Sequence, residues 1–328
     1  MGKLFQIAAV ITVSTMVIGA AGAADCPPPR CDTMRSTITV GAAPGGITDA
    51  IARALAKALS AEWGPDHVLV DNRAGTGGLV AAQFVSRSAA DGGSALLAAS
   101  SLSAAPVFYR NTGFSPAKDL IPVAVVASIP YAIAVSSSRN FNSMEELVAS
   151  AKRAPDKMTY ATGGSDTIEH LVAEMVTRSA NMKMLHVPYK GSIPALTDLL
   201  AGQIDSTIAP PSGLEAYVRA GKVKVLATTG SQRSRRFPEV PTLGELKMQD
   251  ATFENRIVLY VPAGTSPAAL QRWNEVVAKA VRSPELQALI EGQSGAVMAL
   301  SVQETRKLVT AEMSRLADVA AAAGIKPE

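Results

Sequence analysis

Aromatic residues are scarce in this chain, at 5% of 328 residues, so its core has to be built mainly from Ala, Val, Leu and Ile. The net charge is only +3, and the one basic run, at 233–236, is too short to form a nucleic-acid-binding surface. We interpret that run as part of a solvated loop. Hydrophobic residues make up 48% and charged residues 18%, so the chain can bury a core and is not expected to be disordered.

Catalytic signatures are missing as well. The sequence has no G-x-S-x-G elbow, no phosphate-binding loop of the G-x-x-x-x-G-K-[ST] type and no H-E-x-x-H motif. Of its three histidines, His67 and His186 each precede an apolar run, which predicts packing at a strand edge. His170 falls in the first turn of a predicted helix, where it can orient the loop before it. We therefore expect a protein that is not an enzyme and needs no cofactor or metal.

The first 24 residues are typical of a secretory signal peptide. Lys3 supplies the positive charge, residues 4–18 are mostly apolar, and residues 19–24 are small, with cleavage expected after Ala23 or Ala24. The apolar stretch is short for a membrane span. These features predict export of a soluble protein to the periplasm.

The chain has only two cysteines, Cys26 and Cys31, in a Cys- and Pro-rich segment that we place at 25–35. An oxidising compartment permits a disulfide between them. A lipid anchor at Cys26 is disfavoured, because Asp25 stands where such an anchor requires a small neutral residue. Two cysteines without a nearby histidine do not make a metal site.

Short apolar runs alternate with helical periodicity along the chain. Extended runs are predicted at 36–40, 67–72 and 94–100, and helical segments follow the first two of them. This α/β alternation predicts a mostly parallel sheet with helices on both faces. Ligands of such folds bind at the carboxyl ends of the strands.

Two glycine pairs stand where a predicted strand leads into a helix. Both segments have the same order of features: a strand, the glycine pair, a hydroxyl residue and a helix. The first loop candidates are Ala43, Pro44, Gly45, Gly46 and Thr48, and the second are Thr162, Gly163, Gly164, Ser165, Asp166 and Thr167. Glycine lets the free N–H groups of a helix N-terminus reach a carboxylate or phosphate, and the hydroxyls add donors. The alternative is that the glycines are plain turn residues, with Thr48 and Asp166 as helix caps.

Two further segments predict crossings between domains. Residues 120–138 form two extended runs with a break at 128–130, and a return strand is expected near 253–264. The C-terminal part is helical, and its first apolar stripe comprises Trp273, Val276, Val277 and Ala280.

Five stretches in this order resemble the Bug receptors, the periplasmic substrate-binding proteins of the tripartite tricarboxylate transporter family. They are APGGITDAIARALAKALS, VDNRAGTGGLVAAQFV, MTYATGGSDTIEHLVAEM, HVPYKGSIPALTDLLAGQID and VPAGTSP. The resemblance runs from about residue 37 to the C-terminus. It implies a type II periplasmic binding protein, a flytrap with two crossover strands: domain 1 at 36–127 plus 257–328, and domain 2 at 128–256.

The resemblance also implies a function. The two glycine loops would pinch one carboxylate of a small organic acid, often through ordered waters. A membrane permease made of other chains would be the partner, and we expect a monomer that does not bind nucleic acid.

The chain departs from the family pattern at three places. Asp166 and Ile168 replace small residues of the second loop, Arg256 replaces an aromatic residue, and Ala209 replaces an acidic one. We expect Arg256 to hold a second carboxylate, which favours a dicarboxylate ligand, against the alternative of an exposed arginine beside Glu254. We expect Asp166 to cap its helix; if it faces the cleft instead, it favours an amino acid or hydroxylated acid.

Two other functions stay open at this point. A sensory protein of the same fold would present its closed form to a signalling partner. A hydrolase would use Ser165 or Thr167 with His170 as the base, but no third group to orient that histidine is evident.

Overall fold

The computed structural model describes residues 35–64, 67–110 and 112–327. The predicted signal peptide and both cysteines, Cys26 and Cys31, lie outside the described residues. Across those described ranges, no helix combines the length and hydropathy that a membrane crossing needs.

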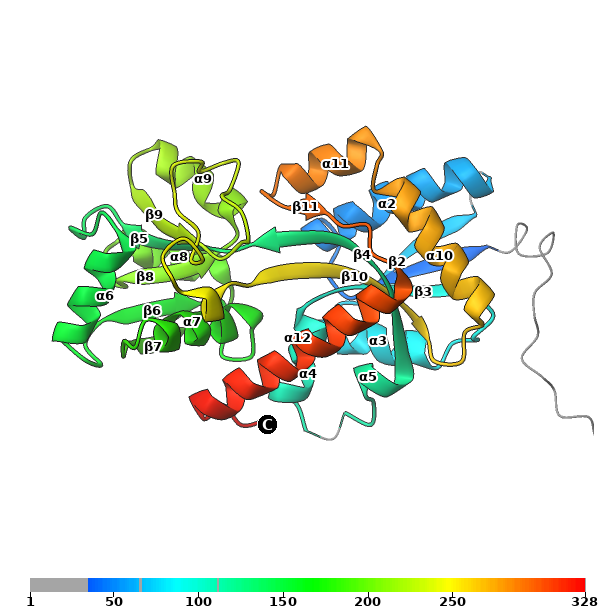
Figure 1. The fold of residues 1–328 in the computed structure, drawn as a ribbon, viewed down its shortest axis with the longest axis horizontal. Coiled ribbons are helices and arrows are strands. Elements are labelled where there is room, and N and C mark those ends of the chain that lie inside the picture. Colours follow the sequence, from blue (N-terminus) through cyan, green and yellow to red (C-terminus); the bar gives the residue numbers. More distant parts are fainter. Residues whose placement is uncertain (1–34, 65–66, 111, 328) are drawn as a thin grey trace, which may run out of the picture.

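The chain folds into two lobes, each built on one sheet and joined by long strands that run between them (Figure 1). The sheet of lobe 1 has the order β11-β4-β10-β3-β1-β2. Its strands are β1 Ser36–Val40, β2 Val68–Asn72, β3 Ser94–Ala99, β4 Leu120–Pro130, β10 Glu254–Pro262 and β11 Ala296–Val297.

The sheet of lobe 2 has the order β7-β6-β8-β5-β9. Its strands are β5 Ala132–Ser136, β6 Thr159–Thr162, β7 Leu185–Pro188, β8 Ser206–Ala209 and β9 Val223–Thr228.

Both sheets are mixed, which corrects the prediction of mostly parallel ones. Strands β1, β2 and β3 are parallel, as are β6, β7 and β8, whereas β10 is antiparallel to β3 and β4, and β5 is antiparallel to β8 and β9. The crossings explain the difference. A chain that leaves lobe 1 along β4 and returns along β10 must run the two strands in opposite directions.

Helices cover both faces of each sheet. In lobe 1 they are α2 Ile47–Trp63, α3 Leu79–Ser86, α4 Ser101–Phe108, α5 Pro116–Asp119, α10 Pro267–Ala280, α11 Pro284–Glu291 and α12 Val302–Ala323. In lobe 2 they are α6 Met144–Arg153, α7 Ile168–Ser179, α8 Ser192–Leu200 and α9 Pro211–Arg219, and two 3-10 turns are η1 Thr76–Gly78 and η2 Gln249–Ala251.

Separate apolar clusters hold these layers together. In lobe 1, α2, α10 and α11 pack on one face of the sheet, and α3, α4 and α12 on the other. The predicted stripe of α10 is buried at all four positions. In lobe 2, α6 and α7 cover one face and α8 and α9 the other. Each lobe is therefore a sheet packed between two layers of helices.

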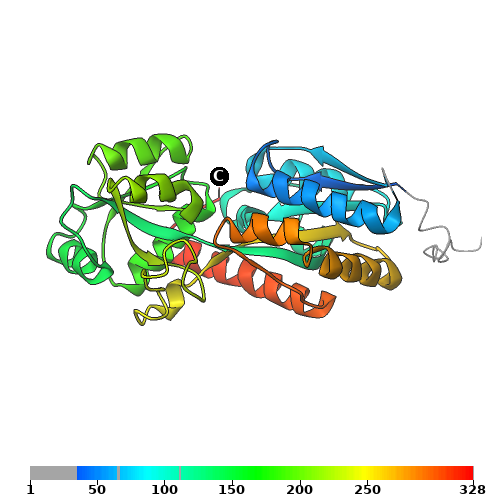
Figure 2. The same ribbon diagram turned by 90° about the horizontal axis from the view of Figure 1, so that it is seen from above.

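The lobes meet along more than the two crossing strands. The first crossing lies at Tyr131, between β4 and β5, slightly after the predicted break. Helix α12 starts on lobe 1 and reaches lobe 2, where Leu316 and Ala320 join the core cluster that includes α7 (Figures 1 and 2). The C-terminal helix thus braces both lobes.

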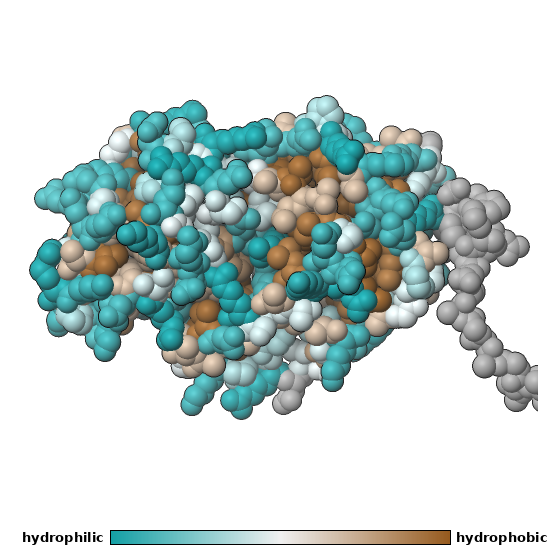
Figure 3. All heavy atoms as spheres, in the orientation of Figure 1, coloured by the Kyte–Doolittle hydropathy of each residue, from teal (hydrophilic) through white to brown (hydrophobic). Residues whose placement is uncertain are grey.

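The surface is mostly hydrophilic, with some exposed apolar side chains. Hydrophilic atoms cover most of the face seen in Figure 3, and apolar atoms gather over the middle of lobe 1. The large apolar side chains that are exposed include Leu69, Val80, Phe84, Leu185 and Ile193, and Ile193 is exposed by 83%.

Candidate ligand-binding site

Strand register places the first glycine loop at the edge of lobe 1 that faces lobe 2. Strand β10 enters from lobe 2 at Glu254, and its Ile257 pairs with Ala99 at the carboxyl end of β3. Because β1 and β2 run parallel to β3, their carboxyl ends lie at the same edge. Residues 41–46, which follow β1 and which we call the first loop, therefore face the second lobe.

The same reasoning places the second loop opposite. Strand β5 enters lobe 2 at Ala132, which pairs with Ala209 at the carboxyl end of β8. Strands β6 and β7 are parallel to β8 in this sheet, so their carboxyl ends lie at the edge that faces lobe 1. Residues 163–167, which follow β6, form the second loop. The two glycine loops therefore lie on facing edges of the two lobes.

Helix caps distinguish this edge from the rest of the molecule. Six described helices follow strands that end there, and five of them have no side-chain cap, at the N-cap residues Gly46 (α2), Gly78 (α3), Ser100 (α4), Gly191 (α8) and Pro210 (α9). The exception is α7, which Thr167 caps. The four helices of eight residues or more that begin elsewhere are all capped, by Ser143, Ser266, Ser283 and Ser301. Uncapped helix starts leave backbone N–H groups without partners and carry a partial positive charge. The facing edges therefore offer donors for an anion.

The first loop is fixed from below by Asp49. This buried carboxylate accepts from the Gly45 N–H at 2.9 Å and from Asn72 Nδ2 at 3.0 Å, and it forms an ion pair with Arg53. The hydrogen bond from Arg53 is the main cause that lowers the pKa of Asp49. Gly45 has φ +84°, a conformation that favours glycine, whereas Gly46 has an ordinary φ of −78°.

The loop's exposure follows from this support. Residues 43–46 are exposed, and Thr48 is buried in the first turn of α2. Thr48 is not the helix cap, because Gly46 holds that position. Exposed backbone at an uncapped helix start therefore makes up the first loop.

The second loop is built differently, from hydroxyl groups. The hydroxyls of Thr162 and Thr167 both donate to the carbonyl of Gly164, at 3.0 and 2.8 Å. Gly164 has φ +156°, and a Cβ there would meet Asp166 Oδ1 at 3.2 Å. The hydroxyl hydrogens that we expected to reach a ligand from Thr167 are thus directed into the loop, while Ser165 is exposed.

The cap of α7 corrects the prediction for Asp166. Thr167 is the cap residue, and its Oγ1 accepts from the N–H of His170 at 3.4 Å. Asp166 instead accepts from the hydroxyl of Tyr109, at the end of α4, at 2.6 Å. Both residues are plausible caps by type, but the helix begins one residue later than Asp166 requires. The second loop is therefore tied directly to lobe 1.

Two stacked histidines support the second loop from beneath. The rings of His170 and His186 lie 3.9 Å apart at 17°. His170 Nδ1 donates to the carbonyl of Ser165 at 2.7 Å, and His186 Nε2 lies 2.7 Å from Thr162 Oγ1. Burial, together with the charge of His170, lowers the pKa of His186 to about 4. A neutral His186 and an oriented His170 therefore hold both ends of the loop.

Arg256 has a partner within the protein. It lies on β10, and its guanidinium forms an ion pair with the buried Glu312 of α12. Its backbone N–H donates to Ser100 Oγ at 2.9 Å. The expected role in holding a second carboxylate stays a prediction, but the charge that this role needs is already neutralised.

The arrangement around Ser165 does not resemble a nucleophile with its base. His170 contacts the backbone carbonyl of Ser165 rather than its hydroxyl. Within the described ranges, no group of three or more His, Cys, Asp or Glu side chains could hold a metal ion.

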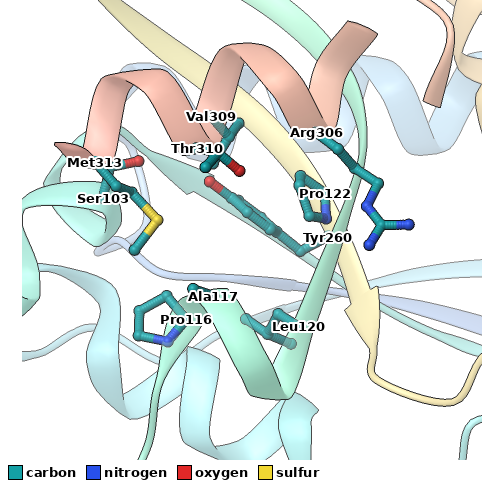
Figure 4. A pocket seen from close by; sticks show the side chains of 10 residues that line it. All are labelled: Ser103, Pro116, Ala117, Leu120, Pro122, Tyr260, Arg306, Val309, Thr310 and Met313. Atoms are coloured by element: carbon teal, nitrogen blue, oxygen red, sulfur yellow. The ribbon is translucent and has the colours of Figure 1, made fainter. Parts of the chain in front are cut away.

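Other cavities are less suitable for a ligand. One of about 70 Å³ lies in lobe 1 under α12, where the ring of Tyr260 projects between α12 and α5 (Figure 4). It has room for only a few water molecules. Another, of about 440 Å³, lies where the 231–235 segment meets β11, and its charged groups are paired within the protein: Arg233 with Glu245, Arg235 with Glu291, and Glu254 with Ser231.

A third cavity adjoins the second loop. It measures about 240 Å³, lies between α8 and α9 over β8, and includes Gly163 in its lining. The 189–191 segment before α8 is held to the second loop, since Tyr189 N donates to Thr162 O and Gly191 N to Gly163 O, both at 3.0 Å. This cavity therefore opens beside the predicted site.

Several contributors to the site were missed by the sequence analysis. They are Asn72, Tyr109, Gly191 and Ser192. Asn72 follows from no local pattern, and Tyr109 meets Asp166 across 57 residues of sequence. Gly191 had a detectable signal, because a glycine between a strand and a helix is the same pattern as in the two predicted loops.

Comparisons with known proteins agree with this geometry. A family model described as "Tripartite tricarboxylate transporter family receptor" matches residues 51–325. The protein BugT of Bordetella pertussis is 30% identical over 318 residues, which cover 96% of each chain. Two solved structures are similar. The periplasmic binding protein BugD has 27% identity and a TM-score of 0.72, and the match covers 89% of this chain and 98% of that one. R. palustris Rpa4515 with adipate has 29% identity and a TM-score of 0.76, and the match covers 90% of this chain and 99% of that one.

Proposed function

The chain belongs to the tripartite tricarboxylate transporter receptor family, and from that premise we propose that it captures a small carboxylate between its two lobes and delivers it to a membrane permease made of other chains. The proposal places the protein in the periplasm and assigns it no catalytic activity. A carboxylate ligand is supported by the similar structure with adipate.

One observation carries the proposal: five of the six described helix starts at the facing edges lack a side-chain cap, α7 being the exception, whereas the described helices of eight residues or more that begin elsewhere have one. A carboxylate supplies the acceptor oxygens that a cap would have supplied, and it interacts favourably with the helix dipoles. Because these starts belong to both lobes, contacts to the ligand are complete only when the lobes are together. Ligand therefore shifts the population toward a closed form.

The proposal names the residues that contact the ligand. They are the exposed backbone of Ala43, Pro44, Gly45 and Gly46, and the second loop at Gly163, Gly164 and Ser165. Thr48, Thr162 and Thr167 position these loops rather than touch the ligand. Thr48 and Thr162 are buried, and the hydroxyls of Thr162 and Thr167 donate to the carbonyl of Gly164.

A thermal-shift screen across monocarboxylates, dicarboxylates, aromatic acids and amino acids tests the proposal, with calorimetry on each hit. A ligand at 100 times its Kd is expected to stabilise the fold by about 2.7 kcal/mol. The proposal fails if no carboxylate gives a saturable shift.

A further inference from the structure

We propose that the ligand carries a single carboxylate and that its uncharged, largely apolar body lies in the cavity between α8 and α9. This inference rests on the proposed function, because it assigns the ligand's carboxylate to the two glycine loops. It replaces the dicarboxylate that the sequence alone favoured with a different class of acid.

The cavity is continuous with the site. Gly163 of the second loop and Ser192 at the start of α8 both line it, and a Cβ on Gly163 would lie 3.3 Å from Ser192 Oγ. Thr207 and Ala209, at the carboxyl end of β8, form its base. A molecule whose carboxylate is held by the second loop can therefore extend between α8 and α9 without leaving the protein.

The lining suits an apolar group. Ile193, Leu196, Ile208, Pro210 and Tyr217 contribute to it, and among the described residues none that lines it carries a charge. The hydroxyl of Thr207 is already used, because it donates to Ala161 O at 3.1 Å. A charged group placed there would lose hydration without gaining an oppositely charged partner among the lining residues.

Ile193 is an exposed apolar side chain at the start of α8. It is the second residue of α8, and its side chain is 83% exposed although the backbone beside it belongs to an uncapped helix start. Covering an exposed aliphatic side chain with an apolar ligand group is favourable in proportion to the area removed from water. The same end of α8 thus offers donors to a carboxylate and an apolar surface to the body of the ligand.

A second carboxylate in the cavity would need a cation, and none of the described residues that line the cavity is one. Arg256 is paired with Glu312, and Lys190, although exposed just before α8, does not line the cavity. Size is compatible with the proposed ligand, since an apolar cavity of about 150 Å³ accommodates benzene. At about 240 Å³, this one has room for a phenyl ring or a short alkyl chain.

Calorimetry with matched acids tests the inference. The pairs are hexanoate with adipate and benzoate with terephthalate, in which each diacid adds one carboxylate to a similar body. We expect the monoacid of each pair to bind at least tenfold more tightly. A diacid that binds as tightly as its partner, or more tightly, overturns the inference.

Two variants locate the effect. Ile193→Ser is expected to weaken hexanoate about tenfold, the order of one buried methylene or more, while acetate, which is too short to reach the cavity, changes less than twofold. Leu185→Ser is the matched control, because Leu185 is an exposed apolar residue outside the cavity lining. Equal losses for hexanoate and acetate in Ile193→Ser would overturn the placement.

The second variant is Ala209→Arg, which adds a cation to the base of the cavity and is expected to reverse the preference within each pair. An unchanged preference in a folded variant that still binds acetate would count against the placement. If no acid of either class binds the unmodified protein, the proposed function itself fails. If diacids bind and that binding is lost in Gly46→Asp, the proposed function stands and only this inference is wrong.

Discussion

The two glycine loops look alike in sequence and are built by opposite means. The first, at 41–46, is braced by a buried charge network around Asp49, and the helix after it is uncapped. The second, at 163–167, is braced by neutral hydroxyl and imidazole groups, and Thr167 caps its helix. Similar strand–glycine–helix patterns therefore differ in what they add to the proposed site. The first loop leads into an uncapped helix start, whereas the second leads into a capped one and is linked to the opposite lobe through Asp166.

The largest expected effect concerns Arg256, which pairs with Glu312 and which we place outside the ligand contacts of both loops. Arg256→Ala leaves Glu312 buried without its partner, which is expected to cost about 3–5 kcal/mol of unfolding free energy. The double variant Arg256→Met with Glu312→Leu is expected to recover most of that loss. Chemical denaturation measures both. A selective loss of diacid binding, with stability unchanged, would return Arg256 to the ligand site.

Valine substitutions separate the loops next. Gly164→Val forces a β-branched residue to φ +156°, with an expected cost of about 1–3 kcal/mol in stability in addition to lost binding. Gly46→Val has an ordinary φ and an open surrounding, so we expect it to lose binding with little change in stability. Denaturation and calorimetry on both proteins check this. Equal destabilisation would erase the difference between the loops.

The link from the second loop to lobe 1 is expected to contribute less. Tyr109→Phe removes the hydroxyl that donates to Asp166, and we expect a loss of about 1 kcal/mol in stability. Ligand affinity is expected to fall several-fold, because the loop loses its tie to the opposite lobe. Asp166→Asn keeps an acceptor and serves as the control. A Tyr109→Phe protein with wild-type stability and affinity would show that the contact does not position the loop.

The smallest expected effect is a pH dependence confined to the second loop. The folded protein lowers the pKa of His186 to about 4, below its usual 6.5. Between these two values the imidazole is protonated in the unfolded chain and neutral in the folded one. This contribution to stability is present above pH 6.5 and is lost as the pH falls toward 4. His186→Gln is expected to flatten that part of the stability curve. Identical slopes for the two proteins between pH 4 and 6.5 would contradict it.

The sequence predicted those parts of the fold that have local signals. The two predicted strand–glycine–helix units are recognisable from the order of their residues. The first crossing was also placed closely, since Tyr131 lies one residue beyond the predicted break. The start of α7 was placed one residue early, because both Asp166 and Thr167 are good caps and only the packed helix chooses between them.

Contacts between distant segments could not be predicted in this way. The run at 233–236 was interpreted as a solvated loop, yet Arg235 pairs with Glu291 and Arg236 donates to Gly292 O, both across the lobes. Arg256 likewise contacts Glu312, which lies 56 positions later in the sequence. Partners of this kind depend on tertiary packing, which no local pattern encodes.

The variant Gly46→Asp tests the central claim, that the uncapped start of α2 is where the carboxylate binds. Gly46 has cap geometry, and a Cβ there meets only Ala43 O at 3.6 Å, so an aspartate can cap the helix from within the protein. Calorimetry with the best carboxylate ligand of the unmodified protein is expected to show binding weakened more than 100-fold, with unchanged or slightly higher thermal stability and with Gly46→Ala nearly unaffected. Undiminished binding by a folded Gly46→Asp protein would contradict the account.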